Sequence, residues 1–228
     1  MSPPEKGWQA AKARIAAAER AVGRASNTVT LLAVSKTFPA SAVREVYALG
    51  QRAFGENYVQ EAVAKRAALA DLADIEWRLI GPLQSNKAAV AAEAFDWVES
   101  VDRLKIAARL SSARPPGRPP LNVLVQVNAS GEASKSGVHP EDAVALARDV
   151  SRLPGLTLRG IMGIPEPTPD EGRQRLQFRV LRACFDACRD AGLPVDTLSM
   201  GMSADLEAAI AEGATEVRIG TAIFGARV

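Results

Sequence analysis

The sequence predicts an α/β fold, a single (β/α)8 barrel of the TIM type that is preceded by an extra N-terminal helix. Three observations support this fold class. Short apolar, β-branched runs alternate with amphipathic helix patterns, and this alternation produces parallel strands joined by right-handed crossovers. Eight such runs occur, and 228 residues is a usual length for one closed barrel. No GxGxxG motif follows the first run, which argues against a dinucleotide-binding sheet.

An Ala-rich, charged segment opens the chain and predicts a helix over about residues 4–22. The strand candidates come next, and each is followed by a turn and a helix pattern. They cover residues 29–35, 52–55, 75–80, 96–100, 121–127, 157–164, 195–199 and 215–219. A Pro- and Gly-rich stretch at residues 114–120 is too short to separate domains and predicts a surface loop. We therefore expect one domain over residues 1–228, with 1–27 as its N-terminal helix and lead-in.

The composition narrows the possible functions. The formal net charge is +2 and the basic residues are spread along the chain, which does not favour a nucleic-acid partner. No apolar run approaches the roughly 18 residues of a membrane span. The first residues also lack the apolar core of a secretory signal. We expect a cytoplasmic protein that associates with neither nucleic acid nor membrane.

Metal-binding residues are scarce. His139 is the single histidine, so a histidine-rich metal site or a His-paired nucleophile is not expected. Cys184 and Cys188 lie four apart in a helix pattern and form no CxxC motif. We interpret both cysteines as small buried hydrophobic residues.

The ends of the last two strands predict a phosphate site. In barrels of this type the active site lies at the C-terminal ends of the strands, and phosphate is often held after strands seven and eight. Gly201 lets the backbone approach a ligand, and Ser203 has the side chain of a helix N-cap. Gly220 and Thr221 repeat the glycine-plus-hydroxyl pattern after the eighth strand. The alternative is two ordinary helix starts.

Three further residues could reach the same mouth of the barrel. Lys36 ends the first strand on the face of Leu32 and Val34, where partial burial would lower its pKa and suit it to Schiff-base chemistry. Its alternative is a lysine that extends to solvent. Arg218 lies within the eighth strand and would either form a structural salt bridge or donate to a ligand. Asn57 would cap the following helix or meet a ligand.

Six segments, taken in order, resemble the pyridoxal phosphate homeostasis protein family, which is similar to the N-terminal barrel of alanine racemases. The resemblance runs from about Val29 to Arg227. The segments are Ala33-Val-Ser-Lys-Thr37, Phe54-Gly-Glu-Asn-Tyr-Val-Gln-Glu61, Ile80-Gly-Pro-Leu-Gln-Ser-Asn-Lys87, Lys135-Ser-Gly137, Ser199-Met-Gly-Met-Ser203 and Val217-Arg-Ile-Gly-Thr-Ala-Ile-Phe-Gly225.

The resemblance implies a barrel that carries pyridoxal 5′-phosphate on a Schiff-base lysine, here Lys36. It further implies that Arg218 faces the pyridine nitrogen and that the two glycine-rich turns hold the phosphate. The implied cofactor-binding residues are Lys36, Asn57, Ser199, Gly201, Met202, Ser203, Arg218, Gly220 and Thr221.

The chain departs from the family pattern in two places. Arg78 stands where family members commonly have histidine, and the C-terminus, Ala226-Arg227-Val228, lacks an aromatic residue. We expect neither departure to touch the residues around the cofactor.

Three functions compete. The first is a carrier and regulator of the cofactor, without robust catalysis, that hands it to apo-enzymes. The second is a pyridoxal-phosphate-dependent amino-acid racemase, and the third is an unrelated sugar-phosphate enzyme. The chain stops soon after the barrel closes, and Tyr47 and Tyr58, its two tyrosines, come early, so the second base of a racemase is not found. We therefore favour the non-enzymatic carrier and expect a monomer.

Overall fold

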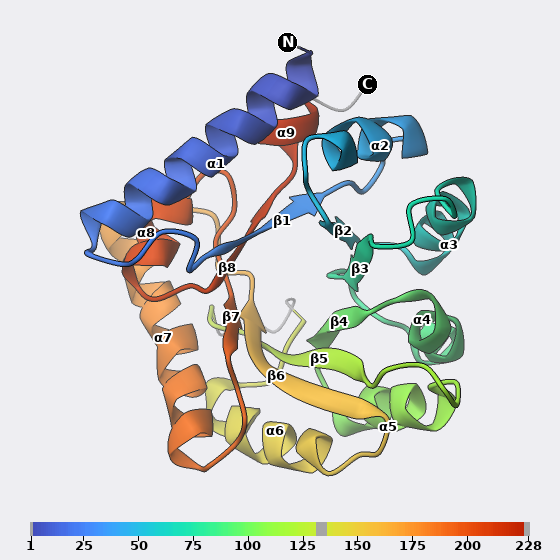
Figure 1. The fold of residues 1–228 in the computed structure, drawn as a ribbon. Coiled ribbons are helices and arrows are strands. Elements are labelled where there is room, and N and C mark those ends of the chain that lie inside the picture. The colour runs from blue at the N-terminus through green and yellow to red at the C-terminus, as the bar shows by residue number, and fades with distance from the viewer. Residues whose placement is uncertain (1, 131–135, 226–228) are drawn as a thin grey trace.

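The computed structural model describes residues 2–130 and 136–225, and its eight parallel strands close into one barrel (Figure 1). The strands follow each other around the barrel in chain order, and β8 pairs with β1 to complete the ring. They are β1 (Thr30–Val34), β2 (Ala53–Glu56), β3 (Glu76–Leu79), β4 (Trp97–Val101), β5 (Leu121–Val127), β6 (Leu156–Gly163), β7 (Thr197–Ser199) and β8 (Glu216–Ile219). The predicted fold class is confirmed.

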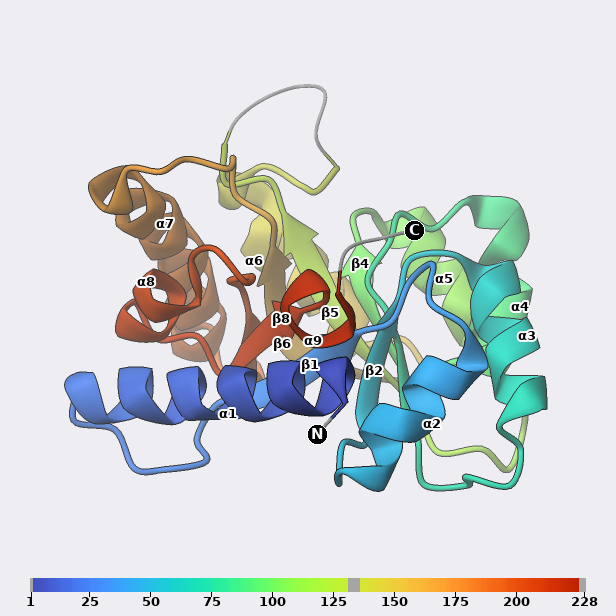
Figure 2. The same ribbon diagram turned by 90° about the horizontal axis from the view of Figure 1, so that it is seen from above.

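Helices cover the outside of the barrel. The α-helices are α1 (Pro3–Ala21), α2 (Ala40–Ala48), α3 (Val59–Ala68), α4 (Ala88–Ala94), α5 (Leu104–Ala113), α6 (Ala143–Ser151), α7 (Glu171–Asp190), α8 (Leu206–Ala211) and α9 (Thr221–Phe224). Two 3-10 turns, η1 (Ser85–Lys87) and η2 (Pro140–Asp142), precede α4 and α6. The extra helix α1 runs alongside α8 and α9 (Figure 2).

The predicted strands agree with the observed ones to within two residues at each end. Two helix starts differ by three residues, and the first is α4, which begins at Ala88 after the 3-10 turn η1 rather than at Ser85. We expected a helix from about Ser203, but α8 begins at Leu206 and Asp205 is its N-cap residue. The Met202 amide donates to the Asp205 carboxylate at 2.6 Å, and this short turn occupies the residues where a first helical turn was expected. Ser203 therefore does not cap α8.

Strand alternation explains the two layers of the core. Side chains that point outward pack with the helices and form the main hydrophobic core. Inside the barrel, two small apolar groups remain separate from it: Leu32, Val34, Ala53 and Ile80, and then Trp97, Leu124 and Met162. Buried polar side chains also lie among the inward positions: Arg78, Glu99, Ser199, Glu216 and Arg218. A charged layer inside a barrel needs partners, and these are described below.

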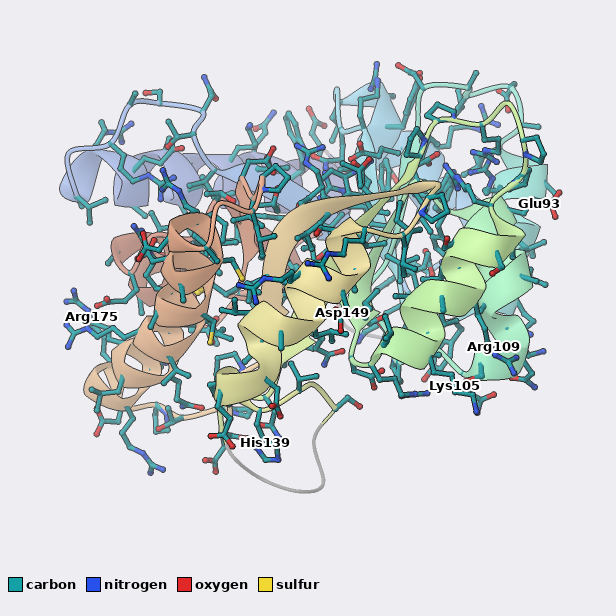
Figure 3. All side chains as sticks on the ribbon, turned by 90° about the horizontal axis from the view of Figure 1, so that it is seen from below. Glu93, Lys105, Arg109, His139, Asp149 and Arg175 are labelled. Carbon is teal, nitrogen blue, oxygen red and sulfur yellow. The ribbon has the colours of Figure 1, made fainter. Side chains whose placement is uncertain are left out.

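The cysteines, the histidine and several basic residues have clear places in the fold. Cys184 and Cys188 are buried on α7, as expected. The described residues contain no cluster of three or more potential metal ligands, and no described helix is long and apolar enough to cross a bilayer. His139 lies at the start of η2, and Figure 3 shows Lys105 and Arg109 side by side on α5, with Arg175 well apart from them on α7.

Candidate functional site

A cavity of about 310 Å³ opens at the C-terminal ends of the strands, where the sequence predicts the site. Its walls come from residues at the ends of β1, β2, β3, β6, β7 and β8. They are Val34, Lys36, Phe38, Asn57, Ile80, Ile164, Met202, Ser203, Ala204, Arg218, Gly220 and Thr221. Such a volume is within the range of small-molecule sites, and the lining is mostly apolar with a few convergent polar groups.

Lys36 lies at the rim of this cavity, two residues beyond β1. Its side chain is half-buried, whereas Val34, the previous inward residue, is buried. Phe38 stands near it and stacks on Phe224 of α9, with ring centroids 5.1 Å apart. The strand-end lysine therefore faces the cavity beside an aromatic wall.

Ser203, Ala204 and Thr221 form one side of the cavity. Among the described residues, no acceptor is bonded to the amides of Ser203 or Ala204. Thr221 is the first residue of α9, so its amide has no intrahelical acceptor. Two hydroxyls and several free amides thus converge, which is a donor set that suits a phosphate dianion. Helices α8 and α9 are only six and four residues long, so these donors count for more than helix dipoles.

Arg218 forms the floor of the cavity and is 4% exposed. Its Nη1 donates to the Ser199 hydroxyl at 2.7 Å, and its Nη2 donates to the Gly163 carbonyl at 2.8 Å. No carboxylate among the described residues forms a direct ion pair with it, so the salt-bridge alternative is not observed. Burial lowers the pKa of Arg218, whereas Glu99 and Glu216 oppose that shift. An arginine nevertheless stays charged in a protein.

A buried network connects Arg218 to Arg78. The Ser199 hydroxyl lies 2.8 Å from Glu99 Oε2 and 2.8 Å from Glu216 Oε1. Arg78 forms ion pairs with Glu216 and Glu99 and stacks over the Trp97 ring at 4.0 Å. Arg78 does not line the cavity, as we expected, yet it reaches Arg218 through these carboxylates and Ser199.

Glu99 lies at the centre of this network and is fully buried. Burial and the neighbouring Glu216 raise the pKa of Glu99 to about 8, although Arg78 and Arg218 oppose the shift. One hydroxyl hydrogen cannot be donated to two carboxylates at once. The geometry is satisfied when Glu99 is protonated and donates to Ser199, which then donates to Glu216.

Most of the residues proposed from the sequence meet in the cavity. Those that line it are Lys36, Asn57, Met202, Ser203, Arg218, Gly220 and Thr221. Ser199 and Gly201 do not line it. Ser199 lies behind Arg218, and the Gly201 carbonyl accepts the Arg218 amide at 3.0 Å. At Gly201, φ is +94° and a Cβ would lie 2.5 Å from Ala209 Cβ, so glycine is needed for packing there.

Asn57 lines the cavity and does not cap α3, whose N-cap residue is Tyr58. Its backbone is held by a close approach to Gly81, where a Cβ would lie 2.3 Å from the Asn57 carbonyl oxygen. Of the segment Lys135-Ser136-Gly137, Lys135 lies outside the described residues, as does the C-terminal Ala226-Arg227-Val228.

Sequence reasoning missed several residues around the site. Ile80 and Ile164 close the apolar walls of the cavity, and they could have been found because each ends a strand candidate. Glu99 was missed because a carboxylate in a short apolar strand carries no local signal for its partners. Its partners come from β3, β7 and β8, which only barrel closure brings together.

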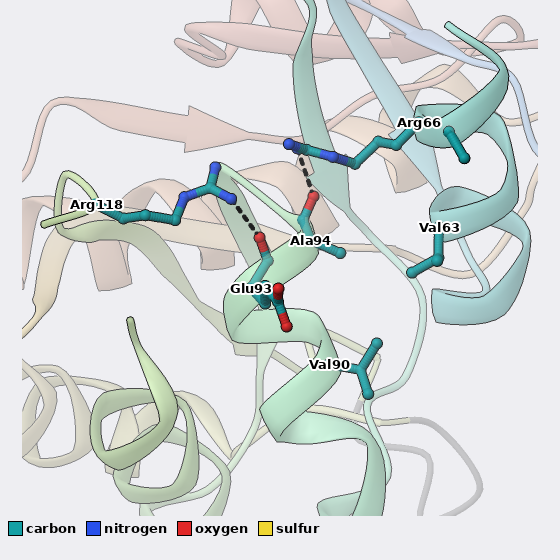
Figure 4. Close-up of a pocket in the computed structure, with 7 residues that line it drawn as sticks. Val63, Arg66, Val90, Glu93, Ala94 and Arg118 are labelled. Atoms are coloured by element: carbon teal, nitrogen blue, oxygen red, sulfur yellow. Dashed lines mark hydrogen bonds between the residues drawn. The ribbon is translucent and has the colours of Figure 1, made fainter. Parts of the chain in front are cut away.

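A larger surface groove lies between α3 and α4, with a volume of about 390 Å³ (Figure 4). Its two arginines already have partners. Arg66 donates to the Ala94 carbonyl at 2.7 Å, and Arg118 donates to the Glu93 carbonyl at 2.5 Å. It therefore lacks the free convergent donors found beside Lys36.

Comparisons with known proteins place the chain in a family. The model of the alanine racemase N-terminal domain family matches residues 9–228. A pyridoxal phosphate homeostasis protein of Pseudomonas aeruginosa is 63% identical over 94% of this chain and 92% of its own length. One from Escherichia coli K12 is 52% identical, again over 94% of this chain and 92% of its own.

A solved structure, PipY of Synechococcus elongatus with pyridoxal phosphate bound, is 42% identical and has a TM-score of 0.80. The alignment covers 94% of this chain and 100% of PipY. The motifs, the closed barrel and these relatives agree, and the chain belongs to the pyridoxal phosphate homeostasis protein family, whose barrel is of the alanine racemase N-terminal type.

Proposed function

We propose that this protein binds pyridoxal 5′-phosphate through a Schiff base on Lys36 and acts in pyridoxal phosphate homeostasis as a carrier rather than as an enzyme. The observation that carries the proposal is the pairing of a half-buried lysine with a phosphate-type donor set in one cavity. The names of the relatives and the cofactor in PipY support it. The nine residues given in the sequence analysis are proposed as the site, with Ser199 and Gly201 acting from behind it.

The cavity residues fit the cofactor at each end. The free amides of Ser203 and Ala204, with the hydroxyls of Ser203 and Thr221, suit its phosphate. The apolar side chains of Val34, Ile80 and Ile164 suit a flat aromatic ring. When bound, the cofactor supplies an aldehyde for the lysine and an electron-withdrawing ring. The Lys36 amine forms a C=N bond to the aldehyde carbon, and the aldehyde oxygen leaves as water.

Arg218 favours binding without strong catalysis. A guanidinium opposite the pyridine nitrogen stays charged, so it donates a hydrogen bond and disfavours protonation of that nitrogen. An unprotonated ring withdraws electrons poorly. Tyr47 donates instead to Asp74, and Tyr58 is exposed. Among the described residues that line the cavity, Lys36 has the only side chain of a type that acts as a general base, so a second base is not found there.

Borohydride reduction and peptide mapping test the proposal. We expect reduction of the protein loaded with pyridoxal 5′-phosphate to leave a phosphopyridoxyl group on Lys36. Lys36→Ala should lose that label, and Lys87→Ala is the matched control that should keep it. A label found mainly on another lysine, or retained in full by Lys36→Ala, would be evidence against the proposed site.

Amino-acid racemisation is the second candidate, because the matching family model describes a domain of alanine racemase. It needs a proton donor on the ring face opposite Lys36.

Transfer of the cofactor to apo-enzymes and a monomeric state are also proposed. Sedimentation of the native protein tests the monomeric state.

A further inference from the structure

A buried charged cluster lies between β2 and α3, directly outside the strand end that carries Lys36. It consists of Lys65 and Glu61 of α3 and Glu56 of β2, and we call it the Lys65 cluster. The Lys65 side chain is 6% exposed and the Glu56 side chain is fully buried. Strand alternation points Glu56 and Ser35 outward, whereas Lys36 and Asn57 reach the cavity. The cluster therefore lies outside the cavity lining.

The Lys65 ammonium makes three hydrogen bonds, which is its full capacity. It donates to the Ser35 carbonyl at 2.6 Å, to Glu56 Oε1 at 2.6 Å and to Glu61 Oε1 at 2.7 Å. One of the three acceptors is thus the backbone of the residue immediately before Lys36.

The two acids of the cluster, Glu56 and Glu61, accept hydrogen bonds from the residues on both sides of Lys36. The Ser35 hydroxyl donates to Glu56 Oε1 at 2.6 Å, and the Thr37 amide donates to Glu61 Oε1 at 2.5 Å. Thr37 has a φ of +69°, a left-handed conformation that a β-branched residue rarely adopts. Such a conformation persists where the surroundings over-determine it. The backbone on each side of Lys36 is therefore fixed by groups that lie outside the cavity.

A buried ion pair is weak evidence of stabilisation, because removing two charges from water offsets their attraction. Burial raises the pKa of Glu56, although Lys65 and Ser35 oppose the shift. Its Oε2 is buried and has no partner among the described residues. A well-packed apolar pair would avoid these costs, so stability alone does not account for this cluster.

We propose that Lys65 is a positioning residue that fixes the direction in which the Lys36 amine enters the cavity. The inference rests on the proposed function, in which the Lys36 nitrogen attacks the aldehyde carbon and the aldehyde oxygen leaves as water. That step needs the two atoms held at a defined distance and angle, and a misplacement of about 1 Å can cost a hundredfold in rate. The phosphate donors lie on other loops, so they hold their ligand without Lys65.

The test measures the rate of Schiff-base formation at Lys36 separately from the affinity of the cavity for a ligand that cannot form one. Lys65→Met removes the charge and the hydrogen bonds, and Arg66→Met is the matched control. Arg66 is the next residue on α3, and its guanidinium contacts the Ala94 carbonyl instead of the Lys36 segment. The rate of Schiff-base formation is measured with pyridoxal 5′-phosphate and with pyridoxal. The affinity for pyridoxine 5′-phosphate, which has the phosphate but no aldehyde, is measured alongside, with thermal unfolding as the check of folding.

We expect Lys65→Met to slow attachment of both aldehydes by about tenfold to a hundredfold. The affinity for pyridoxine 5′-phosphate should stay within about twofold, and Arg66→Met should match the native protein in every measurement. Attachment at the native rate in folded Lys65→Met would overturn the inference. An equal loss of pyridoxine 5′-phosphate affinity would overturn it too, since that result indicates a general structural role.

Two further variants test the inference if Lys65→Met does not fold. The double variant Lys65→Met/Glu56→Gln removes the buried pair without leaving Glu56 as an unpaired buried carboxylate. Glu61→Ala removes the partly exposed acid that accepts from both the Thr37 amide and Lys65, and it leaves the buried Lys65–Glu56 pair in place. Both should slow attachment and spare pyridoxine 5′-phosphate binding, and native rates in either overturn the inference. If the native protein itself forms no Schiff base at Lys36, the proposed function fails first, and the native control shows it.

Discussion

Arg218 shows how one side chain can connect a cavity with a buried charge network. It lines the cavity, and it also donates to Ser199, which bridges Glu99 and Glu216. The same hydrogen bonds, with the one to the Gly163 carbonyl, fix the guanidinium in one orientation at the wall of the cavity. Single residues behind the site therefore decide what Arg218 offers to a ligand.

Ser203 provides the sharpest test of the phosphate end. We expect Ser203→Ala to weaken pyridoxal 5′-phosphate binding by about tenfold to a hundredfold, because a hydrogen bond to a charged group contributes roughly 1.5–3 kcal/mol. Binding of unphosphorylated pyridoxal should hardly change. Titration of both ligands measures the difference, with Ser151→Ala on α6 as a control. Equal losses for both ligands would reject the phosphate site.

Glu99 should make stability depend on pH. Its pKa is raised to about 8 in the folded protein by burial and by Glu216, whereas an unfolded glutamate titrates near its usual value of about 4.3. Folding therefore favours the protonated acid. The stabilisation is complete below the unfolded pKa and is lost as pH rises toward about 8.

The isosteric Glu99→Gln variant mimics the protonated acid and should not lose stability in this way. We expect the native protein to lose stability relative to this variant as the pH rises from the unfolded pKa, about 4.3, to the folded pKa, about 8. Urea unfolding at several pH values measures the free energy of unfolding of both proteins. A constant difference between the two proteins across the interval would show that Glu99 is ionised in the folded state.

At the scale of elements, the extra helix α1 braces the two turns that we propose hold the phosphate. Arg14 donates to the Ser203 carbonyl at 3.0 Å and forms a bidentate pair with Glu207 of α8. At Gly7, an added Cβ would lie 2.2 Å from the Ala222 carbonyl oxygen of α9. α1 thus contacts both the turn before α8 and the backbone of α9.

Gly7→Ala tests this bracing. Alanine favours a helix over glycine by about 1 kcal/mol, so a loss of stability would have to come from the contact with α9. We expect a net loss, because overpacking costs about 1–3 kcal/mol, and a weaker preference for pyridoxal 5′-phosphate over pyridoxal. Thermal unfolding and ligand titration measure both effects.

Gly172→Ala on α7 is the matched control for this substitution. Its added methyl meets only the Asp170 carboxylate, at 3.1 Å, and should be tolerated. A stabilised Gly7→Ala protein with native ligand preference would contradict the bracing role of α1.

At the scale of the whole molecule, the barrel separates two kinds of chemistry. The C-terminal mouth of the barrel carries the Lys36 amine and the hydrogen-bond donors that suit an anion. The interior below it carries buried ion pairs, such as the one between Arg78 and Glu216. Because the described cavity lining offers no second base, we expect the native protein to show no steady racemisation of alanine. Added amino acids could still exchange with Lys36 on the cofactor aldehyde.

Exchange of the α-proton in heavy water, with L- and D-alanine, measures this expectation. Lys36→Ala is the blank, and Arg218→Glu tests whether ring protonation raises the exchange rate. Sustained turnover by the native protein at about 1 s⁻¹ or more, a rate typical of enzymes, would support the racemase instead.

The sequence by itself determined the fold class, the order of the strands and the residues at their C-terminal ends. Hydrophobic periodicity and strand alternation are local properties, so they predict that Lys36, Asn57 and Arg218 face the barrel mouth. Family motifs then indicated the ligand. Local signals also explain the error at Ser203, where a helix was expected to start. A hydrogen bond from the Met202 amide to the Asp205 carboxylate forms a short turn there instead, and the helix starts at Leu206.

Only the tertiary structure decided which residues support the site. Arg78 and Glu216 are 138 residues apart and meet because the barrel closes, so no local pattern could pair them. Lys65 and Ser35 meet because α3 packs against β2, beside the end of β1, a contact that depends on how helix and strands are oriented. Ser199 and Gly201 lie behind the cavity for the same reason. Long-range register and packing, rather than periodicity, fix these contacts.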